Sequence, residues 1–155
     1  MVIVQKSALT PSVTAQLVEL SQRWVEENCS HGMVANTPED LKEPLYIATD
    51  GGRIVGYAFG HVYTQKKRTS YIEPGSRCFD LDELYVLPEY RSQGVGRELF
   101  ARLRDEAALA ADYLTLATST KDYKRVLHFY VDELGMDFHN AFLIRRLQYN
   151  GLEKE

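Results

Sequence analysis

The 155-residue sequence has only two cysteines, Cys29 and Cys78, and neither lies in a C-x-x-C pair. Two isolated thiols are too few for a disulfide scaffold, and they lack the close spacing of structural zinc ligands. The four histidines show no ligand spacing with one another or with the cysteines. We therefore expect a reduced protein without a metal site.

Long apolar runs and an excess of positive charge are also missing. No stretch approaches the roughly 18 apolar residues that can cross a bilayer, and the first ten residues lack the basic start and apolar centre of a secretion signal. The formal net charge is −4, whereas nucleic-acid binding requires clustered Lys and Arg. We therefore expect a soluble cytoplasmic protein that binds neither membrane nor nucleic acid and tolerates a cationic substrate.

The length and composition are those of one globular domain covering residues 1–155. Hydrophobic residues make up 45% of the chain and charged residues 26%, which is ordinary for a folded soluble protein. A chain of this length can enclose one hydrophobic core. The sequence contains no repeats and no linker-like stretch that would divide it into two domains.

Hydrophobic periodicity predicts an alternation of strands and helices. Helical spacing of apolar residues predicts helices at residues 10–28, 97–111 and 121–134, and Thr37-Pro38 predicts the start of a further short helix. Runs of β-favouring residues predict strands at residues 1–5, 45–49, 54–63, 78–86, 113–118 and 138–148. The turn sequence Asp50-Gly51-Gly52 predicts an antiparallel hairpin. This order indicates a mixed α+β domain with at least one parallel crossover.

Residues 91–96, with the sequence Arg-Ser-Gln-Gly-Val-Gly, lie between a predicted strand and a predicted helix. The start of a helix leaves backbone N–H groups unpaired at the positive end of the helix dipole, which favours anions. Gly94 and Gly96 would let a phosphate approach the main chain closely. The segment is too short to match the glycine motifs of dinucleotide or triphosphate sites. It predicts a phosphate cradle, although two glycines before a helix can also be only a turn and a cap.

The spacing R-x-x-G-x-G, preceded by the sequence Leu-Tyr-Val-Leu-Pro-Glu-Tyr at residues 84–90, resembles the signature of the GCN5-related N-acetyltransferase (GNAT) family. The resemblance extends from the first predicted strand to the last. It implies a GNAT fold, with a mixed central sheet of six to seven strands flanked by about four helices, and acetyl-coenzyme A (acetyl-CoA) as cosubstrate. In that family the strand before the cradle splays from its parallel neighbour and pairs with the pantetheine arm. The residues that the resemblance assigns to the cofactor are Leu84, Tyr85, Val86, Arg91, Ser92, Gln93, Gly94, Val95 and Gly96.

The sequence His128-Phe129-Tyr130, shortly before Gly135, resembles the helix of this family whose tyrosine points at the cofactor sulfur. A phenol, with a pKa of about 10, suits the role of proton donor to a thiolate of comparable basicity. The same helical stripe also allows Tyr130 simply to pack in the core. The family often has an asparagine seven residues before the tyrosine, and Tyr123 stands at that position here.

Acyl transfer to an amine requires a base, because an alkylammonium group has a pKa near 10.4. By the period of two of a strand, Asp80 and Asp82 share one face with Leu84 and Val86, while Glu83 points to the other face. The resemblance places the general base, or a residue holding a water that acts as one, at Asp80 and Asp82, and burial of neighbouring carboxylates would raise one pKa. Glu83 takes this role if a bulge shifts the register. A solvated acidic cluster, or carboxylates that only bind a cationic substrate, are the alternatives.

The resemblance implies an N-acetyltransferase that acts on a primary amine of a small molecule by direct attack. No G-x-S-x-G nucleophile elbow is present, so a covalent acyl-enzyme is not expected. Acceptor contacts are predicted at Trp24, Glu27 and Glu83. Two other functions remain open, namely acetylation of a protein N-terminus or lysine, and a non-catalytic CoA-binding regulatory module. The resemblance also implies that the last strand can join a homodimer.

Overall fold

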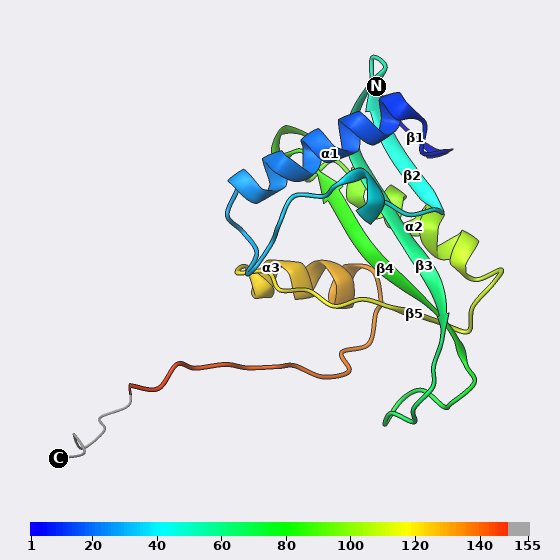
Figure 1. Ribbon diagram of the computed structural model, residues 1–155, viewed down its shortest axis with the longest axis vertical. Coiled ribbons are helices and arrows are strands. Elements are labelled where there is room, and N and C mark those ends of the chain that lie inside the picture. Colours follow the sequence, from blue (N-terminus) through cyan, green and yellow to red (C-terminus); the bar gives the residue numbers. More distant parts are fainter. Residues whose placement is uncertain (149–155) are drawn as a thin grey trace.

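The computed structural model describes residues 1–148, which form one sheet with helices on both faces (Figure 1). The sheet has five strands in the order β1-β2-β3-β4-β5, with β4 and β5 parallel and the other neighbours antiparallel. In chain order the strands and helices are β1 (Val2–Ser7), α1 (Pro11–Glu26), β2 (Leu45–Asp50), β3 (Arg53–Thr64), β4 (Arg77–Val86), α2 (Val95–Ala107), β5 (Tyr113–Thr115) and α3 (Tyr123–Leu127). Two 3₁₀ turns, Pro38–Asp40 and Pro88–Tyr90, and a π-helix, His128–Glu133, complete them.

The two long helices cover opposite faces of the sheet (Figure 1). Helix α1 begins where the Thr10 side chain accepts a hydrogen bond from the Val13 N–H at 3.2 Å, with proline in the first turn. Leu17 of α1 and Leu99 of α2 are both fully buried against the strands. The hydrophobic core therefore has a layer on each side of the sheet. This packing holds the end of α1 and the start of α2 near β4.

The β2–β3 hairpin confirms the prediction made from its turn sequence. Strand β2 ends at Asp50 and β3 begins at Arg53, and these two residues pair. Gly51 and Gly52 both have positive φ, at 57° and 83°. A two-residue hairpin turn that matches the right-handed twist of its strands requires positive φ at both residues.

The prediction of six to seven strands and about four helices is wrong in its numbers. Within residues 1–148 the structure has five strands and three α-helices. Residues 138–148 form no strand, because a β-favouring sequence does not by itself supply a hydrogen-bonding partner. The predicted short helix is only a 3₁₀ turn, which begins with a capping box formed by Thr37 and Asp40. A longer helix is disfavoured, because Glu43 precedes Pro44 and a residue before proline avoids the helical conformation.

Strands β4 and β5 separate soon after they meet. They pair only from Cys78 to Asp80, opposite Tyr113 to Thr115. The strand predicted over residues 113–118 therefore ends early. Residues 81–86 of β4 have no strand on that side within the described chain, and their free edge runs directly toward the start of α2. The splay expected from the family resemblance is thus present.

A β-bulge interrupts the pairing of β3 with β4. Phe59 pairs with Glu83, but the next residue, Gly60, pairs with Leu81, so that Asp82 is an extra residue on β4. A Cβ atom at Gly60 would overlap the backbone of β4, which explains the glycine at this crossing.

The bulge changes which carboxylates share a face. Asp80 lies opposite His61, and Glu83 lies opposite Phe59. His61 and Phe59 are two residues apart on β3 and so point to one face, which places Asp80 and Glu83 on the same face although they are three residues apart. The prediction that Asp80 and Asp82 point together is confirmed, since both lie beside His61. The prediction that they share a face with Leu84 and Val86 is wrong, because these two residues lie opposite Ala58 and Gly56, on the other face of the sheet. The bulge that would favour Glu83 is present.

Candidate active site

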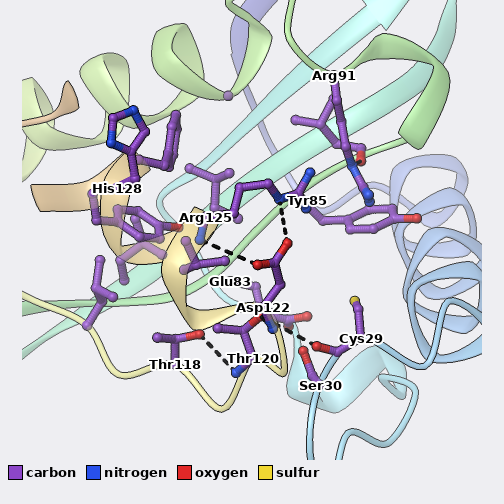
Figure 2. A pocket seen from close by; sticks show the side chains of 18 of the residues that line it. Cys29, Ser30, Glu83, Tyr85, Arg91, Thr118, Thr120, Asp122, Arg125 and His128 are labelled. Atoms are coloured by element: carbon purple, nitrogen blue, oxygen red, sulfur yellow. Dashed lines mark hydrogen bonds and ion pairs between the residues drawn. The ribbon is translucent and has the colours of Figure 1, made fainter. Parts of the chain in front are cut away.

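A cavity of about 600 Å³ fills the opening between β4, the chain after β5, the start of α2 and the π-helix (Figure 2). Most of the predicted site residues line it: Trp24, Asp82, Glu83, Leu84, Tyr85, Val86, Arg91, Ser92, Gly94, Gly96 and Tyr130. The other four, Glu27, Asp80, Gln93 and Val95, lie outside its lining. The fold thus gathers residues from four separate segments of the chain around one space.

The start of α2 offers unpaired backbone N–H groups to this cavity. Gly94 is the N-cap residue, with φ of 84°, and no side chain caps the helix. Ser92 also has positive φ, at 59°, so left-handed residues alternate along the loop as in anion-binding nests. A Cβ atom at Gly96 would lie 3.5 Å from the Phe129 ring and 3.7 Å from the Leu84 side chain. These residues fit a phosphate group, because the N–H groups are free and glycine leaves room beside them.

The Arg91 side chain does not point into this anion site. Its Nη1 lies 2.7 Å from Glu27 Oε1, and its Nε donates to the Val86 carbonyl oxygen at 2.8 Å. The guanidinium lies 5.5 Å from the centre of the Tyr85 ring. Figure 2 shows Arg91 beside Tyr85. Arg91, predicted to contact the cofactor, and Glu27, predicted to contact the acceptor, are therefore occupied by each other.

Tyr130 lies in the π-helix, at the wall opposite β4. Its ring packs against those of Phe129 and Phe100, with centroid distances of 5.0 and 6.1 Å. Burial raises the pKa of Tyr130 to about 12, so its hydroxyl stays protonated at physiological pH. The helix predicted over residues 121–134 is divided into α3 and this π-helix, a geometry that is frequent at functional sites. The structure places Tyr130 as a neutral hydrogen-bond donor at the cavity wall.

Glu83 is the most firmly held carboxylate of the cavity. It accepts hydrogen bonds from Asn36 Nδ2 at 2.7 Å and from the Tyr57 hydroxyl at 3.1 Å. Burial raises the pKa of Glu83, and this outweighs the two hydrogen bonds, which lower it. Sequence patterns did not indicate Asn36 or Tyr57, because they lie 47 and 26 residues before Glu83 and share no motif with it.

Asp82 and Asp80 have different partners. Asp82 lies 2.7 Å from His61 Nδ1 and 3.4 Å from Lys42 Nζ. Asp80 accepts a hydrogen bond from Thr115 at 2.9 Å, and burial raises the pKa of Asp80. The ligand atoms of His61, Asp80 and Asp82 lie within 4.8 Å of one another, a grouping that sequence spacing did not predict because it joins two strands. All three side chains already have partners, namely one another, the Thr115 hydroxyl and the Lys42 ammonium.

A short β-bridge lies at one end of the cavity. Ser30, after α1, pairs with Thr120, after β5. The His31 N–H donates to the Ser119 carbonyl oxygen and the Lys121 N–H to the Cys29 carbonyl oxygen, each at 2.8 Å. Figure 2 shows Cys29 and Ser30 opposite Thr118 and Thr120. A second cavity, of about 230 Å³, adjoins this end and shares Trp24, Cys29 and Ser30 with the larger one.

Comparison of the sequence with known families identifies this arrangement. The sequence model of the acetyltransferase (GNAT) family matches residues 14–136. The chain belongs to the GNAT family. It is accordingly an N-acetyltransferase, and the match covers every residue that lines the cavity. No curated protein shows significant sequence similarity.

Solved structures show the GNAT fold over nearly the whole chain. The aminoglycoside N-acetyltransferase AAC(6')-Iy in complex with CoA is 15% identical, with a TM-score of 0.66 over 94% of this chain and 99% of that one. An acetyltransferase of Trypanosoma brucei is 20% identical, with a TM-score of 0.66 over 95% and 100%. A tetramutant of the BH1408 protein of Bacillus halodurans is 18% identical, with a TM-score of 0.72 over 94% and 99%. None of the helices in residues 1–148 combines the length and apolar character needed to cross a membrane.

Proposed function

We propose that this GNAT domain transfers the acetyl group of acetyl-CoA to a primary amine of a small molecule by direct attack. One observation carries the proposal: a single cavity connects the uncapped start of α2 with Tyr130 and Glu83. The complex of AAC(6')-Iy with CoA supports the cofactor, and its description as an aminoglycoside N-acetyltransferase supports an amine acceptor.

The cofactor would be held mainly by backbone groups. The N–H groups of residues 92–96 bind its pyrophosphate, and the free edge of β4 at Leu84, Tyr85 and Val86 pairs with its pantetheine arm. When bound, acetyl-CoA supplies an activated thioester and a thiolate leaving group. Three of the residues predicted to hold the cofactor contribute through their main chain alone. The Arg91 side chain is paired with Glu27, the Gln93 side chain donates to the Glu89 carbonyl oxygen, and the Val95 side chain is buried.

Glu83 and Tyr130 would perform the proton transfers. Glu83 takes a proton from the acceptor ammonium, directly or through a water, since its raised pKa makes it a better base than an ordinary carboxylate. Tyr130 would donate its hydroxyl proton to the departing sulfur and regain one as the acetylated nitrogen loses its extra proton. Asp82 is the second candidate for the base, with Asp80 behind it. Trp24 and Glu83 are the proposed acceptor contacts, and Glu27 is not, because Arg91 occupies it.

The β-bridge between Ser30 and Thr120 favours a small acceptor over a polypeptide. Ser30 and Thr120 both line the cavity, so their bridge occupies space beside it that a polypeptide acceptor could otherwise use. A screen of polyamines, aminoglycosides, amino-acid derivatives and peptides with acetyl-CoA, following thiol release, tests this. Turnover with a free amine supports the proposal, whereas turnover with peptides alone would assign the chain to the protein-acetylating alternative. Retention of Tyr130 and Glu83 in the cavity opposes a non-catalytic CoA-binding module.

The general base should be visible in the pH dependence of kcat. The pKa of Glu83 is raised, so the carboxyl becomes protonated, and inactive as a base, at a higher pH than an ordinary glutamate. We expect kcat to fall as the pH decreases through this value. Glu83→Gln should lower kcat by about a hundredfold and remove the acidic limb.

Asp82→Asn is the matched comparison, since it makes the same change at the adjacent residue. If Glu83 is the base, Asp82→Asn keeps the acidic limb and mainly raises the acceptor KM. The reverse pattern, with the limb lost only in Asp82→Asn, would transfer the role to Asp82.

We also propose a homodimer, formed by residues 138–148. The segment extends away from the rest of the protein (Figure 1), and Phe142, Leu143 and Ile144 are 89%, 88% and 86% exposed. The residue before the segment is held in place, because the Tyr71 hydroxyl donates a hydrogen bond to Asp137 at 2.7 Å. Apolar side chains on both faces are typical of a strand that is covered on both sides. The outer edge of β5 has no strand partner within residues 1–148. In the proposed dimer, residues 138–148 of each copy pair with this edge of the other copy.

Sedimentation velocity tests this dimer. We expect the wild-type protein to sediment as a dimer and Ile144→Asp as a monomer, because a buried unpaired carboxylate destabilises a strand interface. Leu109→Asp is the matched control, since Leu109 follows α2 and is 88% exposed. It should remain dimeric. A wild-type protein that stays monomeric at high concentration, or an Ile144→Asp variant that stays dimeric, would contradict the proposal.

A further inference from the structure

Arg91 and Glu27 join two parts of the protein that the proposed reaction uses separately. Arg91 is the first residue of the loop at the start of α2, and Glu27 is the C-cap residue that follows α1. Both oxygens of Glu27 contact the guanidinium, at 2.7 and 2.9 Å. The two side chains are only 28% and 21% exposed, so solvent screens this pair less than it screens a surface ion pair.

The connection continues to the acceptor side of the cavity. The Tyr85 hydroxyl donates to Glu27 Oε2 at 2.6 Å, and the Arg91 guanidinium lies over the Tyr85 ring. Trp24 also stacks on that ring, with a centroid distance of 5.0 Å and an interplanar angle of 22°. Trp24 lines both cavities. A continuous series of contacts therefore runs from residues 91–96, here called the phosphate loop, to the cavity wall where the acceptor is proposed to bind.

We propose that Glu27 and Arg91 are positioning residues that couple occupancy of the phosphate loop to the placement of Trp24, and through it to acceptor binding. The inference rests on the proposed function, because it takes the loop as the cofactor site and Trp24 as an acceptor contact. Arg91 does not serve as a phosphate ligand in this role. Its charge is neutralised by Glu27, and the attraction for the anion comes from the backbone N–H groups.

The physical basis of the coupling is a shared rigid connection. Residue 91 moves with the loop, whereas Glu27 moves with α1, and the paired hydrogen bonds allow little relative displacement. A ligand that orders the loop therefore also orders the end of α1 and the Tyr85–Trp24 stack. The coupling free energy is reciprocal, so acceptor binding strengthens cofactor binding by the same factor.

Trp24 is the only tryptophan of the chain, so its fluorescence reports this wall alone. The probe is adenosine 3′-phosphate 5′-diphosphate, which carries the diphosphate of coenzyme A but no pantetheine and so cannot extend along β4 to Trp24. We expect the wild-type protein to bind it in calorimetry and to change its Trp24 emission. Glu27→Gln should keep the affinity within roughly threefold and lose more than half of the emission change.

Two further variants make the test specific. Glu89→Gln removes a different contact between the loop region and α1, the 3.8 Å ion pair of Glu89 with Arg23, and should behave as the wild type. Arg91→Lys keeps the charge but not the two-point contact, and should reproduce the reduced emission change without loss of nucleotide affinity. It also serves if Glu27→Gln does not fold. At saturating acetyl-CoA, Glu27→Gln should raise the acceptor KM severalfold and leave kcat within about twofold.

The outcomes separate the coupling from the proposed function. If the wild-type protein does not bind the nucleotide, the cofactor site itself is refuted. If it binds and Glu27→Gln keeps the full emission change, the coupling is refuted and the function stands. A more than tenfold loss of nucleotide affinity in Arg91→Lys would make Arg91 a phosphate ligand, which also refutes the coupling role.

Discussion

Substitution of Tyr130 by phenylalanine should lower kcat by about a hundredfold or more, with little change in CoA affinity. The variant keeps the ring that packs against Phe129 and Phe100 and removes only the hydroxyl. With a pKa of about 12, that hydroxyl is a donor at every pH at which the enzyme would be assayed. Steady-state kinetics with acetyl-CoA and the best amine of the screen, together with calorimetry of CoA binding, measure the two quantities.

Tyr123→Phe provides the matched control for this prediction. Tyr123 begins α3, on the same stretch of chain, and its side chain is exposed. Its loss of a hydroxyl should leave kcat within about twofold, as is usual for surface changes. Wild-type turnover in Tyr130→Phe would remove Tyr130 from the chemistry and leave it a packing role.

Gly94→Glu should abolish CoA binding while the protein stays folded. The residue has φ of 84°, and a Cβ atom added there would meet no other atom within 4 Å, so the new side chain has room in the fold. It would, however, place a carboxylate where the backbone N–H groups are proposed to receive the pyrophosphate. Calorimetry with CoA should show no measurable binding, and circular dichroism should be unchanged in shape.

Gly75→Glu separates the effect of charge at the site from backbone strain. Gly75 has φ of 90° and is equally open, but it lies in the loop between β3 and β4 and does not line the cavity. A non-glycine residue at positive φ costs a similar amount of stability in both variants. Gly75→Glu should therefore keep its CoA affinity. If both variants lose CoA binding, the loss reflects folding, and if neither does, the cofactor binds elsewhere.

Features encoded in short stretches of the sequence were predicted well. The hairpin at Gly51 and Gly52 and the turn at Gly94 that precedes α2 depend on local backbone conformation, which neighbouring residues specify. The placement of Tyr130 beside the same cavity followed from its family resemblance, and the structure brings the two together. Local signals also specified helix α1, from its Thr10 cap onward.

Features that depend on pairing between distant segments were not predicted. Nothing in the sequence of β4 marks Asp82 as an extra residue, because a bulge is a relation between two strands. The contact of Arg91 with Glu27 joins residues 64 positions apart, and the family resemblance assigned Arg91 only to the cofactor. Residues 138–148 have the composition of a strand, but the structure supplies no partner for them within the described chain. In each case the missing information was the identity of the neighbour.

The separation of β4 from β5 has an evolutionary consequence. A binding groove formed by main-chain atoms makes few demands on which side chains surround it, because almost every residue type carries the same N–H and C=O groups. Substitutions can accumulate along such a groove while the recognition of a common cofactor persists. Solved structures that share only 15 to 20% of their residues with this chain accordingly keep its fold, with TM-scores of 0.66 to 0.72.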